Sequence, residues 1–121
     1  MHDAGFVHRD LKPANVMWLP RENRWTVIDF GRTAAIGSAA PVSFTLAYAA
    51  PEVAAAMQLR EDSVEARPVL DSWALGVLGL EIFTGAPAFD ILALGSGRVR
   101  NLGRFSIYWA SRAQESSFGV W

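Results

Sequence analysis

Residues 8–15 of the chain read HRDLKPAN, a short segment that carries an acid, a base and an amide. Asp10 and Lys12 are two residues apart, so in an extended loop both side chains point to the same side. Lys12 is also the only lysine in the chain, and the other ten basic residues are arginines. A compact ammonium suits a phosphoryl group as a point charge. Asn15 adds a neutral oxygen ligand five residues after Asp10.

Two short β-prone runs follow this segment, VMWL at 16–19 and WTVI at 25–28, with the polar sequence PRENR between them. Two such runs around a turn that contains proline and asparagine predict a β-hairpin. A hairpin returns the chain to near its start, so we expect Asp29 to lie close to Asn15. Carboxylate and amide oxygens of this kind suit Mg²⁺, which takes few protein ligands and shares phosphate oxygens.

The middle of the chain alternates between predicted loops and one helix. Residues 32–49 are rich in small residues and show no sustained period, so we expect a loop there. Pro51 opens the helical pattern PEVAAAMQL, with proline at the first position and an acid in the first turn. Residues 60–68 are charged and predict a surface loop.

The apolar run WALGVLGLEIF at 73–83 predicts a second helix. Asp71 and Ser72 are good N-cap residues for it. The run is hydrophobic nearly all round, which is typical of a buried helix. Gly76 and Gly79 in its interior predict that another backbone packs closely against it.

Length and composition restrict the class of protein. The 121 residues allow one domain, and a mean hydropathy of +0.17 is too high for a disordered chain. A formal charge of −1 lacks the excess of positive charge that is typical of proteins that bind nucleic acid or an anionic membrane. The absence of cysteine excludes disulfides and thiolate chemistry. No apolar run is long enough to span a bilayer, so the default expectation is a soluble, cytoplasmic chain.

Four motifs occur in a fixed order, and together they resemble the eukaryotic protein kinases. The segment 8–15 is similar to the catalytic loop of that family, and the triplet DFG at 29–31 is similar to its metal-binding motif. APE at 50–52 resembles the end of the activation segment, and DSWALG at 71–76 resembles the start of a buried helix. The resemblance covers residues 1 to 89. It implies an α+β, mostly α fold, a fragment of the C-terminal lobe without the N-terminal lobe.

The resemblance implies a role for each polar residue of the site. Asp10 would accept the proton of the substrate hydroxyl, and Lys12 would contact the γ-phosphate of ATP. Asn15 and Asp29 would bind Mg²⁺. Thr45 matches the threonine that serine/threonine kinases place against the catalytic aspartate and lysine. The implied cofactors are therefore ATP and Mg²⁺, and the implied partner is a protein substrate with a serine or threonine.

Structural or regulatory roles are implied for six further residues: His8, Arg9, Phe30, Gly31, Glu52 and Asp71. His8 and Phe30 would pack as core residues. Asp71 would hold the catalytic-loop backbone from below, although it also fits a simple helix cap.

Regulation by phosphorylation is a hypothesis that rests on Arg9, which precedes Asp10 as in kinases whose arginine pairs with a phosphorylated activation loop. Ser38 and Ser43 are candidate phosphorylation sites. The alternative is that these small polar residues only fill a loop.

Only nine residues precede Asp10, and the sequence contains neither a glycine-rich loop nor a second lysine for a small-lobe strand. We therefore expect this chain alone to be inactive. Residues 90–121 match no pattern and form an unrecognised C-terminal segment.

Three function classes stay open: part of a serine/threonine protein kinase, a pseudokinase-like regulatory fragment, and a truncated gene product without a function. A small-molecule kinase is disfavoured by Lys12-Pro13 and by the APE motif at 50–52. The sequence leaves the oligomeric state undetermined.

Overall fold

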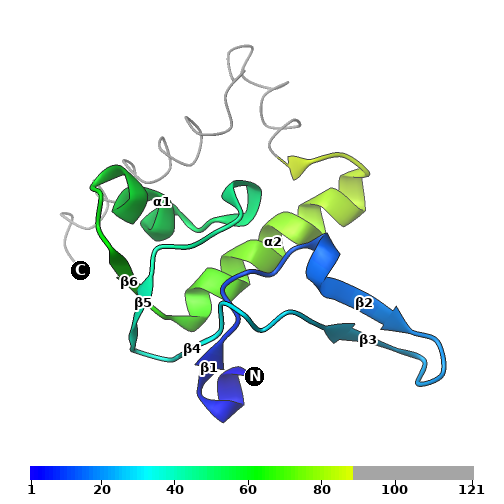
Figure 1. Ribbon diagram of the computed structural model, residues 1–121. Coiled ribbons are helices and arrows are strands. Elements are labelled where there is room, and N and C mark those ends of the chain that lie inside the picture. Colours follow the sequence, from blue (N-terminus) through cyan, green and yellow to red (C-terminus); the bar gives the residue numbers. More distant parts are fainter. Residues whose placement is uncertain (89–121) are drawn as a thin grey trace, which may run out of the picture.

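The computed structural model describes residues 1–88, so the segment 90–121 and Phe89 lie outside the described residues. The described part combines short strands, two α-helices and three 3-10 helices (Figure 1). The strands are β1 (Phe6–Val7), β2 (Val16–Leu19), β3 (Arg24–Val27), β4 (Ala34–Ala35), β5 (Ala39–Pro41) and β6 (Ser63–Glu65). The helices are η1 (His2–Ala4), η2 (Pro13–Asn15), η3 (Leu46–Tyr48), α1 (Pro51–Gln58) and α2 (Pro68–Thr84).

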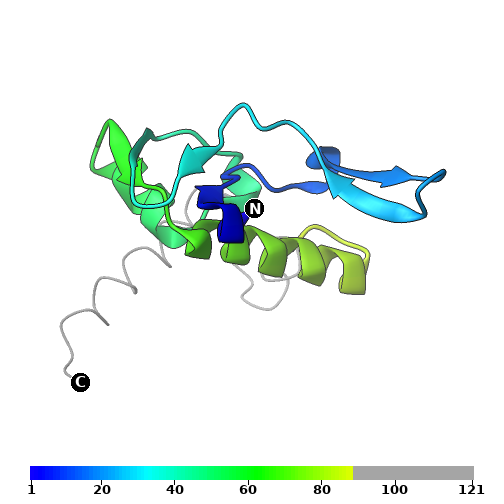
Figure 2. The ribbon, with the colours of Figure 1, turned by 90° about the horizontal axis from the view of Figure 1, so that it is seen from below.

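The strands form three separate antiparallel pairs, β1 with β4, β2 with β3 and β5 with β6. The β2–β3 pair is the predicted hairpin, and its register places Trp18 opposite Trp25. The two indole rings lie 5.3 Å apart between centroids, the kind of cross-strand aromatic pair that stabilises a two-stranded sheet. In Figures 1 and 2 this hairpin extends beyond the C-terminal half of α2, on the side away from α1.

Two segments that we expected to be loops contain strands. Residues 32–49 hold β4, β5 and η3, and the charged segment 60–68 holds β6. The β5–β6 register pairs Ala40 with Val64. Each of these strands has only two or three residues, too few to show an alternating pattern, and each is stabilised by a partner far away in sequence.

The second helix begins earlier than its apolar run predicts. α2 starts at Pro68, whose fixed φ suits the first helical position, and the N-cap Arg67 makes no side-chain capping bond. Asp71 therefore lies in the first turn, Ser72 is the next residue along the helix, and neither caps it. Ser72 Oγ donates instead to the carbonyl of Pro68, and Asp71 is free to bond the loop beside it. The helix ends at Gly85, which adopts φ 69° as its left-handed cap.

The prediction that α2 is a buried helix is wrong for the described part of the chain. Its fully buried residues lie on one stripe: Leu70, Asp71, Ala74 and Val77. Phe83 is 93% exposed and Ile82 is 74% exposed, because no described element covers that face. The glycines at 76 and 79 also have no described neighbour within 4 Å of an added Cβ, so the expected close backbone contact is absent there.

The core is small and rich in alanine. One cluster joins β1, β5, α1 and α2 through Val7, Ala40, Val53 and Leu70, with Trp73 packed against it. A second, smaller cluster packs Tyr48 and Trp73 around Val77. Trp73 therefore links the two clusters. Within residues 1–88, no helix combines the length and the apolar character that a membrane crossing requires.

The exposed face of α2 generates a stability prediction. We expect the purified 121-residue chain to unfold over a broad temperature range and to bind the hydrophobic dye ANS. Replacing Ile82 and Phe83 together by lysine should reduce dye binding and self-association and change the unfolding free energy by less than about 0.5 kcal/mol. Leu70→Ala should instead destabilise by about 2–5 kcal/mol, because it empties a core position. Sharp, cooperative unfolding without dye binding would contradict this expectation.

Candidate active site

A buried carboxylate on α2 holds the segment 8–15 in place. Asp71 is only 2% exposed, and its two oxygens accept hydrogen bonds from the backbone N–H groups of His8 and Arg9, both at 2.8 Å. His2 Nε2 lies 2.8 Å from the same carboxylate. A buried charge is costly unless it is hydrogen-bonded, and here three donors satisfy it. The anchoring arrangement is therefore present, and the alternative of a simple helix cap is wrong.

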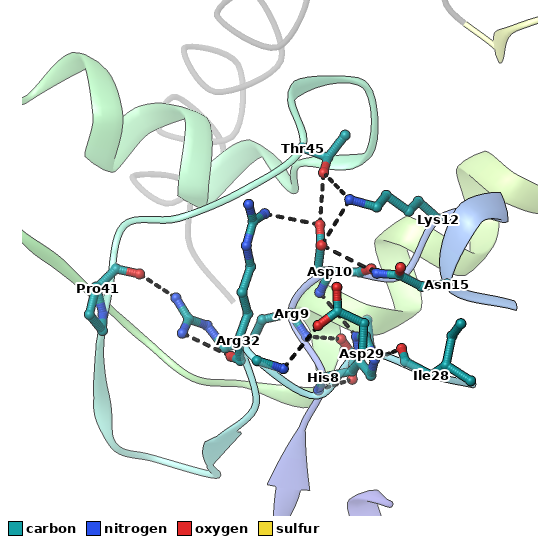
Figure 3. Close-up of polar contacts among 12 residues, drawn as sticks. His8, Arg9, Asp10, Lys12, Asn15, Ile28, Asp29, Arg32, Pro41 and Thr45 are labelled. Atoms are coloured by element: carbon teal, nitrogen blue, oxygen red, sulfur yellow. Dashed lines mark hydrogen bonds and ion pairs between the residues drawn. The ribbon is translucent and has the colours of Figure 1, made fainter.

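These bonds also support an unusual backbone at Arg9, which adopts φ 70°. The left-handed conformation costs a residue with a side chain roughly 1–2 kcal/mol. Because Asp71 accepts the Arg9 N–H, this turn is maintained and the next residue, Asp10, faces away from α2 toward residues 32–45 (Figure 3).

The Arg9 guanidinium binds backbone carbonyls of the segment that follows the DFG triplet. It donates to the backbone carbonyls of Arg32, at 3.2 Å, and of Pro41, whereas its buried Nε has no partner in the described structure. Burial and the nearby positive charge of Arg32 lower the pKa of Arg9, and the negative charge of Asp71 opposes them. Arg9 thus ties β5 and the segment after the DFG triplet to the catalytic loop.

The Asp10 carboxylate is the centre of the site and receives four donors (Figure 3). Thr45 Oγ1 donates to Oδ1 at 2.7 Å, and Arg32 Nη1 donates to the same oxygen at 3.0 Å. Lys12 Nζ donates to Oδ2 at 3.0 Å, and Asn15 Nδ2 lies 3.3 Å from that oxygen. Lys12 also bonds Thr45, at 3.2 Å, so these side chains form one connected network.

This network keeps Asp10 ionised. Burial favours the neutral acid, but hydrogen bonds from Thr45 and Lys12, together with the charges of Arg32 and Lys12, outweigh it and lower the pKa of Asp10. A carboxylate held in this form is able to accept a proton at neutral pH.

The two expected metal ligands lie at the base of the hairpin. The Ile28 N–H donates to the Asn15 carbonyl at 2.9 Å, which brings Asp29, the next residue, back to the catalytic loop. Asn15 is buried, and its Nδ2 is occupied by the Asp10 carbonyl at 2.8 Å. Its amide oxygen is therefore the atom that remains for a metal. Asp29 is exposed, at φ 62°, and within residues 1–88 its side chain accepts one hydrogen bond, from the Gly31 N–H at 3.3 Å.

The aromatic pair behaves differently from the expectation. His8 is completely buried, and its Nε2 lies 3.1 Å from the Ile28 carbonyl. Phe30 meets His8 edge to face, with 5.4 Å between ring centroids, but is 54% exposed. Phe30 is therefore not a core residue within residues 1–88. Gly31 follows, and a Cβ added there would lie 3.2 Å from an Asp29 carboxylate oxygen, so the exposed Asp29 side chain would have to shift slightly to admit a larger residue.

Three regulatory candidates lie outside the Asp10 network. Glu52 is exposed at the start of α1 and makes no ion pair with any residue in the range 1–88. Ser38 is partly buried, and its Oγ donates to the Ala35 carbonyl at 2.7 Å. Ser43 lines a cavity of about 20 Å³ beside Arg9 and Thr45, close to the arginine that was expected to pair with a phosphate.

Sequence reasoning missed two contacts of the site. Arg32 pairs with Asp10, and no motif signals it because it stands alone after the DFG triplet. Tyr48 donates to Glu81 at 2.7 Å, which fastens η3 to α2 next to Thr45. The Ala88 N–H donates to the other Glu81 oxygen, at 3.3 Å. The Arg32–Asp10 and Tyr48–Glu81 contacts each join residues more than twenty positions apart.

Comparison with known proteins gives a consistent assignment. A family model described as protein kinase domain matches residues 1–111. The chain is 42% identical over 94 residues to the serine/threonine-protein kinase PknB of Mycobacterium leprae, covering 73% of this chain and 14% of that protein. It is 42% identical over 87 residues to the serine/threonine-protein kinase SBK1 of Mus musculus, covering 70% of this chain and 20% of that protein.

A solved structure has a similar fold over 71% of this chain. The Cydia pomonella granulovirus kinase PK-1 aligns with a TM-score of 0.56 and 27% identity, covering 71% of this chain and 30% of that one. This chain thus spans about a fifth or less of the two curated relatives described above and about a third of the viral kinase.

The Tyr48–Glu81 contact generates a titration prediction. Burial and the Glu81 carboxylate raise the pKa of Tyr48 to about 12. The chain has two tyrosines, so the difference in phenolate absorbance between the wild type and Tyr48→Phe isolates this group. It should ionise near pH 12. Because the unfolded tyrosine ionises at about 10, stability should fall as the pH rises from about 10 to 12.

Glu81→Gln is the matched test of the cause. It should lower the pKa of Tyr48, since the negative charge is removed while the side-chain shape is kept. If the phenol titrates near its ordinary value in the wild type, the contact is wrong.

Proposed function

The chain belongs to the protein kinase family, and on this basis we propose that it supplies the catalytic loop and activation segment of the C-terminal lobe of a serine/threonine protein kinase. The motifs on which the proposal rests lie within residues 1–89, and the family match continues beyond them to residue 111, into the segment 90–121 that we expected to be unrecognised. The reaction is transfer of the γ-phosphoryl group of ATP to a serine or threonine hydroxyl of a protein. The observation that carries the proposal is the buried, ionised Asp10 with Lys12 and Thr45 within hydrogen-bond distance.

Each side chain of the network has a task in this reaction. Asp10 orients the attacking hydroxyl and accepts its proton. Lys12 places one positive charge beside the phosphoryl group that is being transferred. Thr45 bonds both side chains, so the activation segment and the catalytic loop are held together at the point of attack. This threonine supports serine/threonine specificity.

Mg²⁺ fits the oxygen atoms available at the hairpin base. Asn15 offers its amide oxygen and Asp29 its exposed carboxylate. Residues 1–88 contain no cluster of three or more His, Cys, Asp or Glu side chains, so the ion would keep phosphate oxygens and water as its other ligands. When bound, it would neutralise charge on the ATP phosphates.

Regulation through Ser43 is part of the same proposal. A phosphate on this residue would add about two negative charges at a cavity that Arg9 also lines, and the buried Nε of Arg9 has no partner within residues 1–88. Ser38 is the weaker candidate, because its hydroxyl already bonds the backbone. Phosphopeptide mapping of protein from growing cells should find Ser43 modified, and its absence would reject this part.

A non-catalytic role is the second candidate. The 121 residues contain no glycine-rich loop and no second lysine to hold the ATP phosphates. In this role the segment around Asp10 would bind a kinase substrate or regulator without transferring a phosphoryl group.

Phosphoryl transfer decides between the two roles. We expect sequencing of the transcript through both ends to supply the complete reading frame, and its product should phosphorylate a mixed serine and threonine substrate. Asp10→Asn should lower kcat by about 10²- to 10⁴-fold, because the general base is lost. Asp62→Asn, an exposed control, should leave it unchanged. Equal activity of the wild type and Asp10→Asn would reject the catalytic role.

The 121-residue chain itself gives a complementary result. Calorimetry should detect no binding of Mg·ATP at ordinary nucleotide concentrations. Tight binding that is lost in Asp29→Asn would show that these residues alone form a nucleotide site.

A further inference from the structure

Arg32 makes the least expected contact in the site. It follows directly after the DFG triplet at 29–31, and its Nη1 lies 3.0 Å from Asp10 Oδ1. The Asp10 side chain is 5% exposed and the Arg32 side chain 35% exposed. Figure 3 shows the guanidinium reaching Asp10 from the side opposite Asn15 and Lys12. The arginine therefore covers Oδ1 of the carboxylate on that side.

The four donors fill the acceptor capacity of Asp10. A carboxylate offers about four lone-pair positions, two on each oxygen. Thr45 and Arg32 occupy Oδ1, and Lys12 and Asn15 approach Oδ2. A substrate hydroxyl must donate to one of these oxygens before Asp10 accepts its proton. One of the four donors must leave for that to happen.

Arg32 is the donor that leaves at the lowest cost. Asn15 is buried and is fixed by a second bond to the Asp10 carbonyl, and Lys12 and Thr45 bond each other. The Arg32 guanidinium makes no second hydrogen bond with residues 1–88 and is already partly hydrated. Its backbone carbonyl stays bound to Arg9 when the side chain moves. The side chain is thus able to swing into water while the turn remains in place.

We propose that Arg32 is a latch on the catalytic base: its guanidinium occupies the position in front of Asp10 that the substrate hydroxyl takes, and the substrate displaces it. This inference rests on the proposed function, since it assumes that Asp10 is the base. It adds an autoinhibitory contact within the activation segment, which a protein substrate relieves by competition.

Carboxyl labelling tests whether Arg32 blocks access of a reagent to the Asp10 carboxylate. The 121-residue chain is treated with a carbodiimide and an amine, and labelling of each acid is read by peptide mass spectrometry. Arg32→Gln should raise labelling of Asp10 about two- to fivefold, the factor that corresponds to losing a partly exposed ion pair. The matched control is Arg24→Gln, which breaks the exposed pair with Glu22 and should leave Asp10 unchanged. Equal labelling of Asp10 in the wild type and Arg32→Gln would overturn the latch.

The reciprocal experiment labels the arginine. Phenylglyoxal should modify Arg32 about two- to fivefold faster in Asp10→Asn than in the wild type, because the charged partner is removed. Asp62→Asn should have no effect. An unchanged rate at Arg32 would also overturn the proposal.

Kinetics separates this inference from the proposed function. In the phosphotransfer assay of the complete product, Arg32→Gln should lower the KM for the protein substrate about two- to fivefold and leave the KM for ATP unchanged, because the latch competes only with the hydroxyl. An unchanged or raised protein KM would contradict the latch. The labelling experiments need no ATP, so they give a result for the latch even if phosphoryl transfer is not found.

Discussion

The interaction on which the rest of the site depends is the hydrogen bonding of the Asp71 carboxylate to the backbone of His8 and Arg9. A charged side chain inside the first turn of a helix is well placed, because the N-terminus of the helix favours negative charge. Burial makes the same charge costly unless donors surround it, so the loop must present its N–H groups there. The left-handed backbone of Arg9 is the geometric consequence, and it directs Asp10 away from the helix.

Asp10 then organises the segment that follows the hairpin. Thr45 and Arg32 both donate to its carboxylate, although they belong to opposite ends of residues 32–45. Tyr48 binds Glu81 on α2, so the end of the segment is tied to the same helix that anchors its beginning through Asp71. Residues 8–15 and residues 32–48 therefore share one support, and both depend on a helix whose other face carries exposed Ile82 and Phe83.

The sequence predicted those features that local chemistry specifies. The hairpin follows from two β-prone runs around a proline and asparagine turn, and α1 follows from Pro51 at its first position. The grouping of Asp10 with Lys12 came from their spacing, and the placement of Thr45 beside them was implied by the resemblance to serine/threonine kinases. The pairing of β5 with β6 and the Arg32 contact depend on partners distant in sequence, so no local pattern shows them. The burial of α2 was mispredicted because hydrophobic side chains on all sides of a helix do not show which other elements cover it.

Amide hydrogen exchange at His8 and Arg9 tests the central claim, that Asp71 holds the catalytic loop, most directly. In the wild type both amides should be protected, and Asp71→Asn should raise the exchange rate of at least one of them about ten- to hundredfold, as the loss of a bond to a charged acceptor implies. Asp62→Asn, an exposed aspartate near the start of β6, should leave both rates unchanged. Unprotected amides in the wild type, or equal rates in Asp71→Asn, would contradict the account.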